Sequence, residues 1–459
     1  MRKVLNDILS LSGANLINFV TAGITVFFLP KVMTTSSFGY FQFIQLISAY
    51  ANILQLGWTD GIYLRFGGKY YKDLDLKKLS AQFWMLFFWG GIISILFLAF
   101  LSDTSSCELL FISILGAILL FTRPASIFLQ VILQMTGRNK EYALVPLISG
   151  LVFLVFQIVG LIIRISDVRF YGLGFVLSMV SALMLAALKN KKLVFSLPNF
   201  LNFFGEVKEN ISVGIKLTIG SYSALGIIGV VQWLVKLNFS ISTFARLSIA
   251  LSMTNVLLPF INSVSLALFP SLKRDIKNQN KVYITINTLI NYFLPILLLL
   301  YFLIAAVLKI WLPAYSTSIT YLSILFPLVA MQAKYEIVNN TFLKSLREEK
   351  FILLLNVMCV SLSFLSVLIL IYFFPNIDLI LVGVDLVLLI RLCIATNRVQ
   401  KIIATKSSNK SFYSMLFIFM ASGVISNGSL IMYFIIYIIS VVLYMIFNIK
   451  KVYAIIKNK

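Results

Sequence analysis

Residues 12–65 read SGANLINFVTAGITVFFLPKVMTTSSFGYFQFIQLISAYANILQLGWTDGIYLR. This stretch predicts two membrane helices joined by a short outer loop around residues 30–40, because a long apolar segment lies on each side of that loop. Amides that face lipid would leave hydrogen bonds unmet at a cost of roughly 2–7 kcal/mol each. We therefore expect the polar stripe of each helix to face protein or water. The stripes are Asn15, Asn18, Ala22 and Thr25 in the first helix and Gln42, Gln45, Ala49 and Asn52 in the second.

The composition is that of a polytopic membrane protein. Of the 459 residues, 60% are hydrophobic and only 12% are charged, which is too little charge to cover a soluble protein of this size. The formal net charge of +22 is explained by lysine and arginine in cytoplasmic loops, so we expect no nucleic-acid partner. Histidine is absent and the three cysteines are scattered, so we expect no histidine catalysis, no metal site and no disulfide framework.

Apolar segments long enough to cross a bilayer, about 20 residues each, recur along the whole chain. They predict an all-α integral membrane protein with about 14 transmembrane helices, beginning with an uncleaved first span. We expect the fourth helix to be opened at Arg123 and Pro124, because proline removes a backbone hydrogen bond. The predicted spans are residues 12–30, 40–58, 81–101, 109–130, 142–163, 170–188, 215–236, 246–268, 283–308, 317–339, 351–373, 378–397, 411–427 and 430–449.

Basic residues alternate between the two sides of this topology. The predicted outer loops carry only Lys31, Arg164, Arg169 and Lys309, with Lys236 and Arg246 at their edges, and every second connection holds a cluster of lysine and arginine. Because cytoplasmic loops of membrane proteins are enriched in these residues, both termini are predicted to be cytoplasmic.

A weak internal repeat predicts two six-helix lobes. The sequence TSSFG at residues 35–39 is echoed by ISTFA at residues 241–245, and Ser248, Ser252 and Asn255 follow the second copy on one side of a helix. The aromatic residues of the inter-lobe linker favour an interfacial amphipathic segment there. The predicted parts are an N-terminal lobe at 1–188, a cytoplasmic linker at 189–214, a C-terminal lobe at 215–400, and two additional helices with a basic tail at 401–459.

Charged residues in or beside the predicted spans are candidates for function. A charge at the bilayer centre costs roughly 2.5–3.5 kcal/mol, so such residues usually face the interior of the bundle. The candidate cations are Arg65, Arg123, Lys216, Lys236, Arg246 and Lys334, and the candidate acids for ion coupling are Asp60, Glu336 and Asp385.

Two interpretations of these cations remain open. In the structural one, Arg123 pairs with Asp60, Lys334 is neutralised by Glu336 or Asp385, and the boundary lysines and Arg65 extend to the interface. In the functional one, the cations bind an anion, for which the planar fork of arginine suits phosphate. We favour the functional interpretation for Arg123, because no acid lies three or four residues away on its helix.

The sequence argues against an enzyme. It has no phosphate-binding glycine loop and no nucleophile elbow. Asp73 and Asp75 have the spacing of a metal- and nucleotide-sugar-binding pair, but they lie among Lys72, Lys77 and Lys78 and are interpreted as a solvated charge run. The predicted outer loops are too short to form a catalytic domain.

A set of loose motifs recurs in order between residue 1 and about residue 400. They are LP at 29–30, TSSFGY at 35–40, LG at 56–57, Arg65, ALFPSL at 267–272, WLPAY at 311–315 and LFP at 325–327. In order and spacing they resemble the polysaccharide transport family, the Wzx-type flippases of the multidrug/oligosaccharidyl-lipid/polysaccharide exporter superfamily. The sequence departs from that family at QWLVK, residues 232–236, where the family often has an acidic residue.

The resemblance implies two lobes around a central cavity that is lined by the first, second, seventh and eighth helices. It implies alternating-access transport of an undecaprenyl-pyrophosphate-linked oligosaccharide across the bacterial inner membrane, for O-antigen, capsule or exopolysaccharide synthesis. Cations would hold the pyrophosphate, and amides and hydroxyls would hold the sugars. We expect no cofactor; membrane lipids, a polysaccharide polymerase and a chain-length regulator are the further partners expected. A cation-coupled drug antiporter of the same superfamily and a membrane glycosyltransferase or polymerase remain alternatives.

Overall fold

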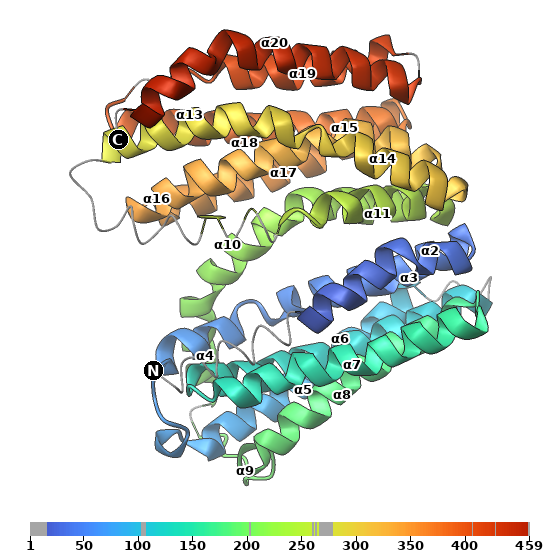
Figure 1. Ribbon diagram of the computed structural model, residues 1–459. Coiled ribbons are helices and arrows are strands. Elements are labelled where there is room, and N and C mark those ends of the chain that lie inside the picture. Colours follow the sequence, from blue (N-terminus) through green and yellow to red (C-terminus); the bar gives the residue numbers. More distant parts are fainter. Residues whose placement is uncertain are drawn as a thin grey trace. The chain divides into compact units, whose positions relative to one another are not determined.

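The computed structural model describes residues 16–101, 107–201, 203–258, 261, 264–265, 279–405, 407–426 and 428–457. Within these ranges the chain forms helices, turns and loops, and no strand (Figure 1). Nine of the described helices are long and apolar enough to cross a membrane, and Leu16–Val32 and Lys410–Ile425 are shorter apolar helices. In its described part, each predicted span coincides with a helix or with a broken helix. The all-α membrane architecture is therefore confirmed.

The chain divides into two compact units, Met1–Tyr222 and Ser223–Lys459, which meet inside one long helix, α10 (Phe203–Asn238). The limits predicted for the lobes and the linker stay a prediction. The first unit contains Leu16–Val32, whose last turn is α2 (Leu29–Val32), then α3 (Thr35–Tyr50), η1 (Ala51–Gln55), α4 (Trp58–Phe66), η2 (Tyr71–Asp73), α5 (Leu76–Leu101), α6 (Cys107–Met135), α7 (Asn139–Ile163), α8 (Val168–Lys189), α9 (Lys191–Val194) and the first part of α10.

In its described residues the second unit is also built of helices joined by turns and loops. The last part of α10 packs on it, because Ser363 Oγ donates a hydrogen bond of 2.8 Å to the carbonyl oxygen of Ile227. Its other elements are α11 (Ile241–Asn255), α13 (Gln279–Leu297), α14 (Leu300–Trp311), η4 (Pro313–Tyr315), α15 (Thr317–Lys334), the π-helix η5 (Tyr335–Asn340), α16 (Thr341–Ser345), α17 (Glu349–Phe373), α18 (Ile377–Ile402), α19 (Lys410–Ile425) and α20 (Leu430–Lys457).

The first hairpin is tighter than the sequence predicts. Pro30 lies in the first turn of α2, where its missing N–H costs no hydrogen bond. The side chain of Thr34 caps α3 by accepting a hydrogen bond of 3.1 Å from the backbone N–H of Ser37. The predicted loop at residues 30–40 is therefore wrong: the connection is reduced to residues 33–34, and Tyr40 lies inside α3.

The second predicted helix breaks at Leu56 and Gly57, which adopt positive φ angles of 51° and 85°. The break turns α4 onto α10 at very short range. A Cβ atom at Gly61 would lie 1.9 Å from the carbonyl oxygen of Asn210, and one at Gly214 would lie 2.0 Å from the carbonyl oxygen of Gly57. Only residues without a side chain allow two helix backbones to approach this closely.

The helix break lies at a different proline from the one predicted, Pro124 beside Arg123. Helix α6 is continuous through Pro124, so the predicted opening at this point is wrong. The helix does break after Pro295, since α13 ends at Leu297 and α14 begins at Leu300. Proline cannot bond the carbonyl four residues earlier, that of Asn291. This oxygen instead accepts a hydrogen bond of 3.2 Å from the hydroxyl of Tyr444 in α20.

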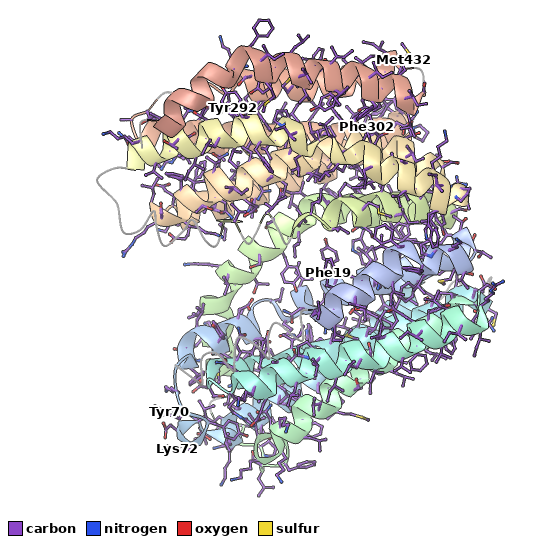
Figure 2. All side chains as sticks on the ribbon, viewed as in Figure 1. Phe19, Tyr70, Lys72, Tyr292, Phe302 and Met432 are labelled. Carbon is purple, nitrogen blue, oxygen red and sulfur yellow. The ribbon has the colours of Figure 1, made fainter. Side chains whose placement is uncertain are left out.

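Aromatic side chains join the last two helices to the rest of the second unit. The ring of Phe302 in α14 lies 4.9 Å from that of Tyr433 in α20, and the ring of Tyr292 in α13 lies 5.7 Å from that of Tyr444. Figure 2 labels Tyr292 and Phe302 on these two helices. The hydroxyl of Tyr437 donates a hydrogen bond of 2.9 Å to the carbonyl oxygen of Pro295. Side chains of α20 thus donate hydrogen bonds to backbone carbonyl groups at the break between α13 and α14.

Replacing Gly61 by alanine should destabilise the protein by about 1–3 kcal/mol, because the new methyl group would overpack the contact between α4 and α10. Thermal unfolding of the purified protein in detergent measures this effect. Gly23→Ala is the matched control, since a Cβ atom at Gly23 meets nothing within 4 Å. Equal melting temperatures for the two variants would contradict the close approach.

Candidate substrate-binding site

The amide stripe of the first unit lies outside its packed core. Gln42 and Gln45 on α3, and Asn52 on η1, are only half-buried, whereas the other faces of α3 are buried. Asn18 on the Leu16–Val32 helix is exposed, and Asn15 lies outside the described residues. These amides are available to a ligand.

Thr25 does not share this position, although the sequence places it on the same stripe. It is buried, and its Oγ1 accepts a hydrogen bond of 2.8 Å from Nε2 of Gln157 in α7. Thr25 therefore belongs to a helix–helix contact and not to the accessible polar face.

A hydrogen-bonded chain of polar side chains continues from Asn52 into the first unit. Buried Gln55 donates to Asn52 Oδ1 and accepts from Thr59 Oγ1. Gln55 Nε2 also donates to the carbonyl oxygen of Pro124, at 3.2 Å. The side chain of Asn52 also interacts with the hydroxyl of Tyr222 on α10. The chain thus joins η1, α4, α6 and α10.

Arg123 reaches this polar chain from α6. Its guanidinium interacts electrostatically with the Tyr222 hydroxyl, and its NH1 contacts the sulfur of Met179 at 3.3 Å. Its Nε is buried without a hydrogen-bond partner. In the part of the chain that the structure describes, no carboxylate lies within 4.0 Å of Arg123 to form an ion pair.

Asp60 does not neutralise Arg123. Its carboxylate accepts a hydrogen bond from Thr218 Oγ1 on α10, and it interacts electrostatically with Tyr222. The ion pair between Asp60 and Arg123, which the structural interpretation allowed, is not formed among the described contacts. Among the described residues, Arg123 therefore has no ion-pair partner, and its positive charge interacts with the Tyr222 hydroxyl.

Arg65 forms ion pairs and a hydrogen bond with side chains of α10. Its NH1 donates to Glu206 at 3.1 Å and to Asn210 at 2.6 Å, and its NH2 pairs with Glu209 at 2.6 Å. These contacts hold the end of α4 against the beginning of α10. Lys216, on the same helix, is exposed.

Lys334 in the second unit is fully buried and paired with neutral groups. Its Nζ donates to Oδ1 of Asn291 at 2.5 Å and to Oδ1 of Asn409 at 2.8 Å. It also lies 4.3 Å from the ring centre of Phe412. Among the ion pairs of the described residues, none joins Lys334 to Glu336 or Asp385. This geometry ties α15 to α13 and to the start of α19, which gives Lys334 a structural role.

Three further charged residues of the second unit lie on η5 and α18: Glu336, Asp385 and Arg391. Buried Arg391 donates to Asn356 at 3.0 Å and to Gln332 at 3.2 Å, and it stacks 3.6 Å above the ring of Tyr335. Glu336 accepts hydrogen bonds from Gln332 at 3.3 Å and from Asn340 at 2.7 Å. Both carboxyl oxygens of Asp385 are buried without a partner. Ion coupling by these acids stays a prediction.

The polar residues of α11 are not uniformly accessible. Ser248 is buried and its Oγ has no hydrogen-bond partner, whereas Ser252 is half-buried and Asn255 is exposed. Arg246 is half-buried and interacts electrostatically with Tyr321. Lys236, in the last turn of α10, is also half-buried. Their predicted position opposite the amide stripe stays a prediction.

No protein-family model matches the sequence, and comparison with curated proteins gives no match. Among solved structures, the chain is similar to the lipid II flippase MurJ in an inward closed conformation, with a TM-score of 0.63, 15% identity, and coverage of 96% of this chain and 99% of that one. It is also similar to an inward-facing multidrug resistance MATE family transporter of the MOP superfamily, with a TM-score of 0.58, 15% identity, and coverage of 87% and 98%.

The chain shares the fold of these two structures. One of these structures is a flippase and the other a multidrug transporter, and their fold has two lobes. The predicted fold class is confirmed by this likeness, which spans nearly the whole chain.

Sequence reasoning missed several residues of the site. Gln55 and Thr59 follow Asn52 at helical spacing, so extending the amide stripe by two turns would have found both. Tyr222 carries no such signal, because it lies 170 residues from Asn52 and only the packing of α10 brings it near. The same holds for Asn291 and Asn409 around Lys334.

Replacing Lys334 by methionine should lower the stability of the folded protein by about 1–3 kcal/mol, because Asn291 Oδ1 loses its charged donor inside the core. We expect folded yield and melting temperature to fall, with transport per folded molecule unchanged. Lys344→Met, at an exposed lysine, is the control. A fully stable Lys334→Met protein that has lost transport would show that Lys334 acts on the substrate.

Proposed function

We propose that this protein is a flippase that moves an undecaprenyl-pyrophosphate-linked oligosaccharide repeat unit across the bacterial inner membrane by alternating access. Arg123 carries the proposal: it is a membrane-embedded guanidinium with no carboxylate at ion-pair distance in the described residues. A group of this kind is costly to bury unless polar acceptors or an anion surround it, and Arg123 lacks the amide acceptors that surround Arg391. The likeness to a lipid II flippase supports a lipid-linked substrate.

Arg123 is suited to a pyrophosphate because its strongest donors lack strong acceptors. Nε has no partner, and the sulfur that NH1 contacts is a weak acceptor. A phosphate oxygen would form a shorter, charge-assisted hydrogen bond to the same nitrogens. The Tyr222 hydroxyl, which interacts with Arg123, offers a further donor to the same ligand.

The amide stripe supplies the chemistry that a sugar requires. Each glutamine or asparagine side chain offers two donor hydrogens and an acceptor oxygen, and each sugar hydroxyl can both donate and accept. Gln42, Gln45 and Asn52 lie outside the packed core, and Asn52 interacts with the Tyr222 hydroxyl. We place the oligosaccharide along this stripe, the pyrophosphate at Arg123 and the lipid tail in the bilayer.

The proposed setting follows from the same substrate. The flippase would serve O-antigen, capsule or exopolysaccharide synthesis, with both termini in the cytoplasm. A polysaccharide polymerase and a chain-length regulator would be its partners. We propose a transporter that catalyses no bond change, as for the proteins of the same fold.

The second candidate function is a cation-coupled drug antiporter. Two observations favour it: the fold is shared with a multidrug resistance transporter, and Asp385 is a buried carboxyl group without a hydrogen-bond partner. A cationic drug would need a carboxylate at its binding site. In the first unit, however, Asp60 is already hydrogen-bonded to Thr218 and lies on the same polar chain as Arg123, which has no ion-pair partner in the described residues.

Deletion of the gene, in a strain that has no redundant flippase, should remove the surface polysaccharide and leave the lipid-linked repeat unit on the cytoplasmic leaflet. Extraction of lipid-linked sugars and their accessibility to a periplasmic ligase measure the two outcomes. Normal surface polysaccharide would refute the proposal. Raised drug sensitivity with intact polysaccharide would favour the antiporter, and polymerised glycan retained inside would favour a polymerase.

Replacing Arg123 by glutamine should lower flipping of the lipid-linked substrate in proteoliposomes by roughly 10- to 100-fold, the equivalent of a lost charge-assisted hydrogen bond. Arg123→Lys should retain part of the activity, because it keeps the charge but not the planar fork. Arg164→Gln, at an exposed arginine after α7, is the control. If Arg123→Gln loses folded protein and activity in equal proportion, Arg123 is structural.

A further inference from the structure

We propose that residues 191–201, between α9 and the start of α10, form a docking site for anionic phospholipid headgroups at the membrane surface. Four large apolar side chains stand out from this segment: Phe195 is 81% exposed, Leu197 81%, Phe200 57% and Leu201 76%. So dense a group of exposed aromatic and aliphatic side chains is unfavourable in water and marks an interaction surface. The segment lies beyond the end of α8, outside the membrane-spanning helices.

The segment is held firmly in place. Its Ser196 hydroxyl donates a hydrogen bond of 3.0 Å to the carbonyl oxygen of Leu76. The backbone N–H of Asn199 donates a hydrogen bond of 3.1 Å to the carbonyl oxygen of Lys77. Trp84 donates to the carbonyl oxygen of Val194 at 3.1 Å, and Leu193 is fully buried. Because the backbone is fixed to the first turns of α5, the outward display of the apolar side chains is built into the fold.

Lysines surround the apolar side chains. Lys191 and Lys192 directly precede them and are exposed, and so are Lys77 and Lys208 on the adjoining helices. The nearby acids do not cancel this charge. Glu206 and Glu209 are paired with Arg65 and Lys78, and Asp75 accepts from the backbone N–H of Lys78 at the start of α5.

This combination fits an anionic lipid surface. Aromatic and leucine side chains can enter the boundary between headgroups and acyl chains, while lysine ammonium groups bind lipid phosphates beside them. The inner leaflet of a bacterial membrane carries anionic lipid, and the distribution of lysine and arginine predicts that this side of the protein faces it. A soluble protein partner would not explain why lysines lie on both sides of the apolar side chains. The inference stands apart from the identity of the transported substrate.

The test uses the full-length protein in detergent, titrated with phosphatidylglycerol or with phosphatidylcholine and followed by native mass spectrometry. The wild-type protein should bind phosphatidylglycerol in preference. Lys191→Gln with Lys192→Gln should weaken that affinity about 25-fold, at about 1 kcal/mol per lysine, and leave phosphatidylcholine binding unchanged. The matched control is Lys344→Gln with Lys350→Gln, which removes the same charge from two exposed lysines of the second unit.

A second double variant tests the apolar part. Phe195→Ser with Leu197→Ser should lower the affinity for both lipids, because it removes inserted apolar area and no charge. Both side chains are exposed, so the variant should fold normally, and its melting temperature in detergent checks this. Wild-type affinity for phosphatidylglycerol in the two segment variants would overturn the proposal. So would an equal loss in the control pair, or a copurifying protein whose retention requires these residues while lipid binding does not.

Discussion

The bilayer interior offers no water, so each polar group placed there needs a partner within the protein or a ligand. The second unit meets this requirement for its buried cations with neutral groups. Amide oxygens and an aromatic ring surround Lys334, and amides and the ring of Tyr335 surround Arg391. Arg123 in the first unit has no such shell. Among the described residues, the acceptors around Lys334 and Arg391 therefore distinguish these two cations from Arg123, for which we propose an anionic ligand.

The polar chain of the first unit depends on the close approach of α4 and α10. Gly57, Gly61 and Gly214 allow the two backbones to touch, and the break at Leu56 turns α4 toward the contact. Further along α10, the Thr218 hydroxyl donates a hydrogen bond to Asp60, and the Tyr222 hydroxyl interacts with Asn52. At its end, Arg65 binds the acids of α10. A single glycine-mediated contact thus positions groups that lie more than 140 residues apart in the sequence.

Much of the helical architecture could be predicted, because span length and apolar periodicity are local properties of a sequence. Even the half-buried face of α3 was visible in the spacing of Gln42, Gln45 and Asn52. The predicted break at Pro124 was wrong, because a proline next to a charge does not break a helix that its surroundings support. The predicted loop at residues 30–40 was also wrong, because a proline in the first turn and a threonine cap favour helix over loop there.

The sequence by itself determined that the chain is helical and membrane-embedded. It also determined which two helices carry polar stripes and which charged residues lie in or beside the spans. What only the tertiary structure decided is the partner of each charge. Asp60 could have neutralised Arg123, and Glu336 or Asp385 could have neutralised Lys334, on the strength of their positions in the sequence. Helix packing instead gave Asp60 to Thr218 and Lys334 to two asparagines, because a hydrogen bond requires contact within about 3 Å and sequence spacing sets such distances only within one helix.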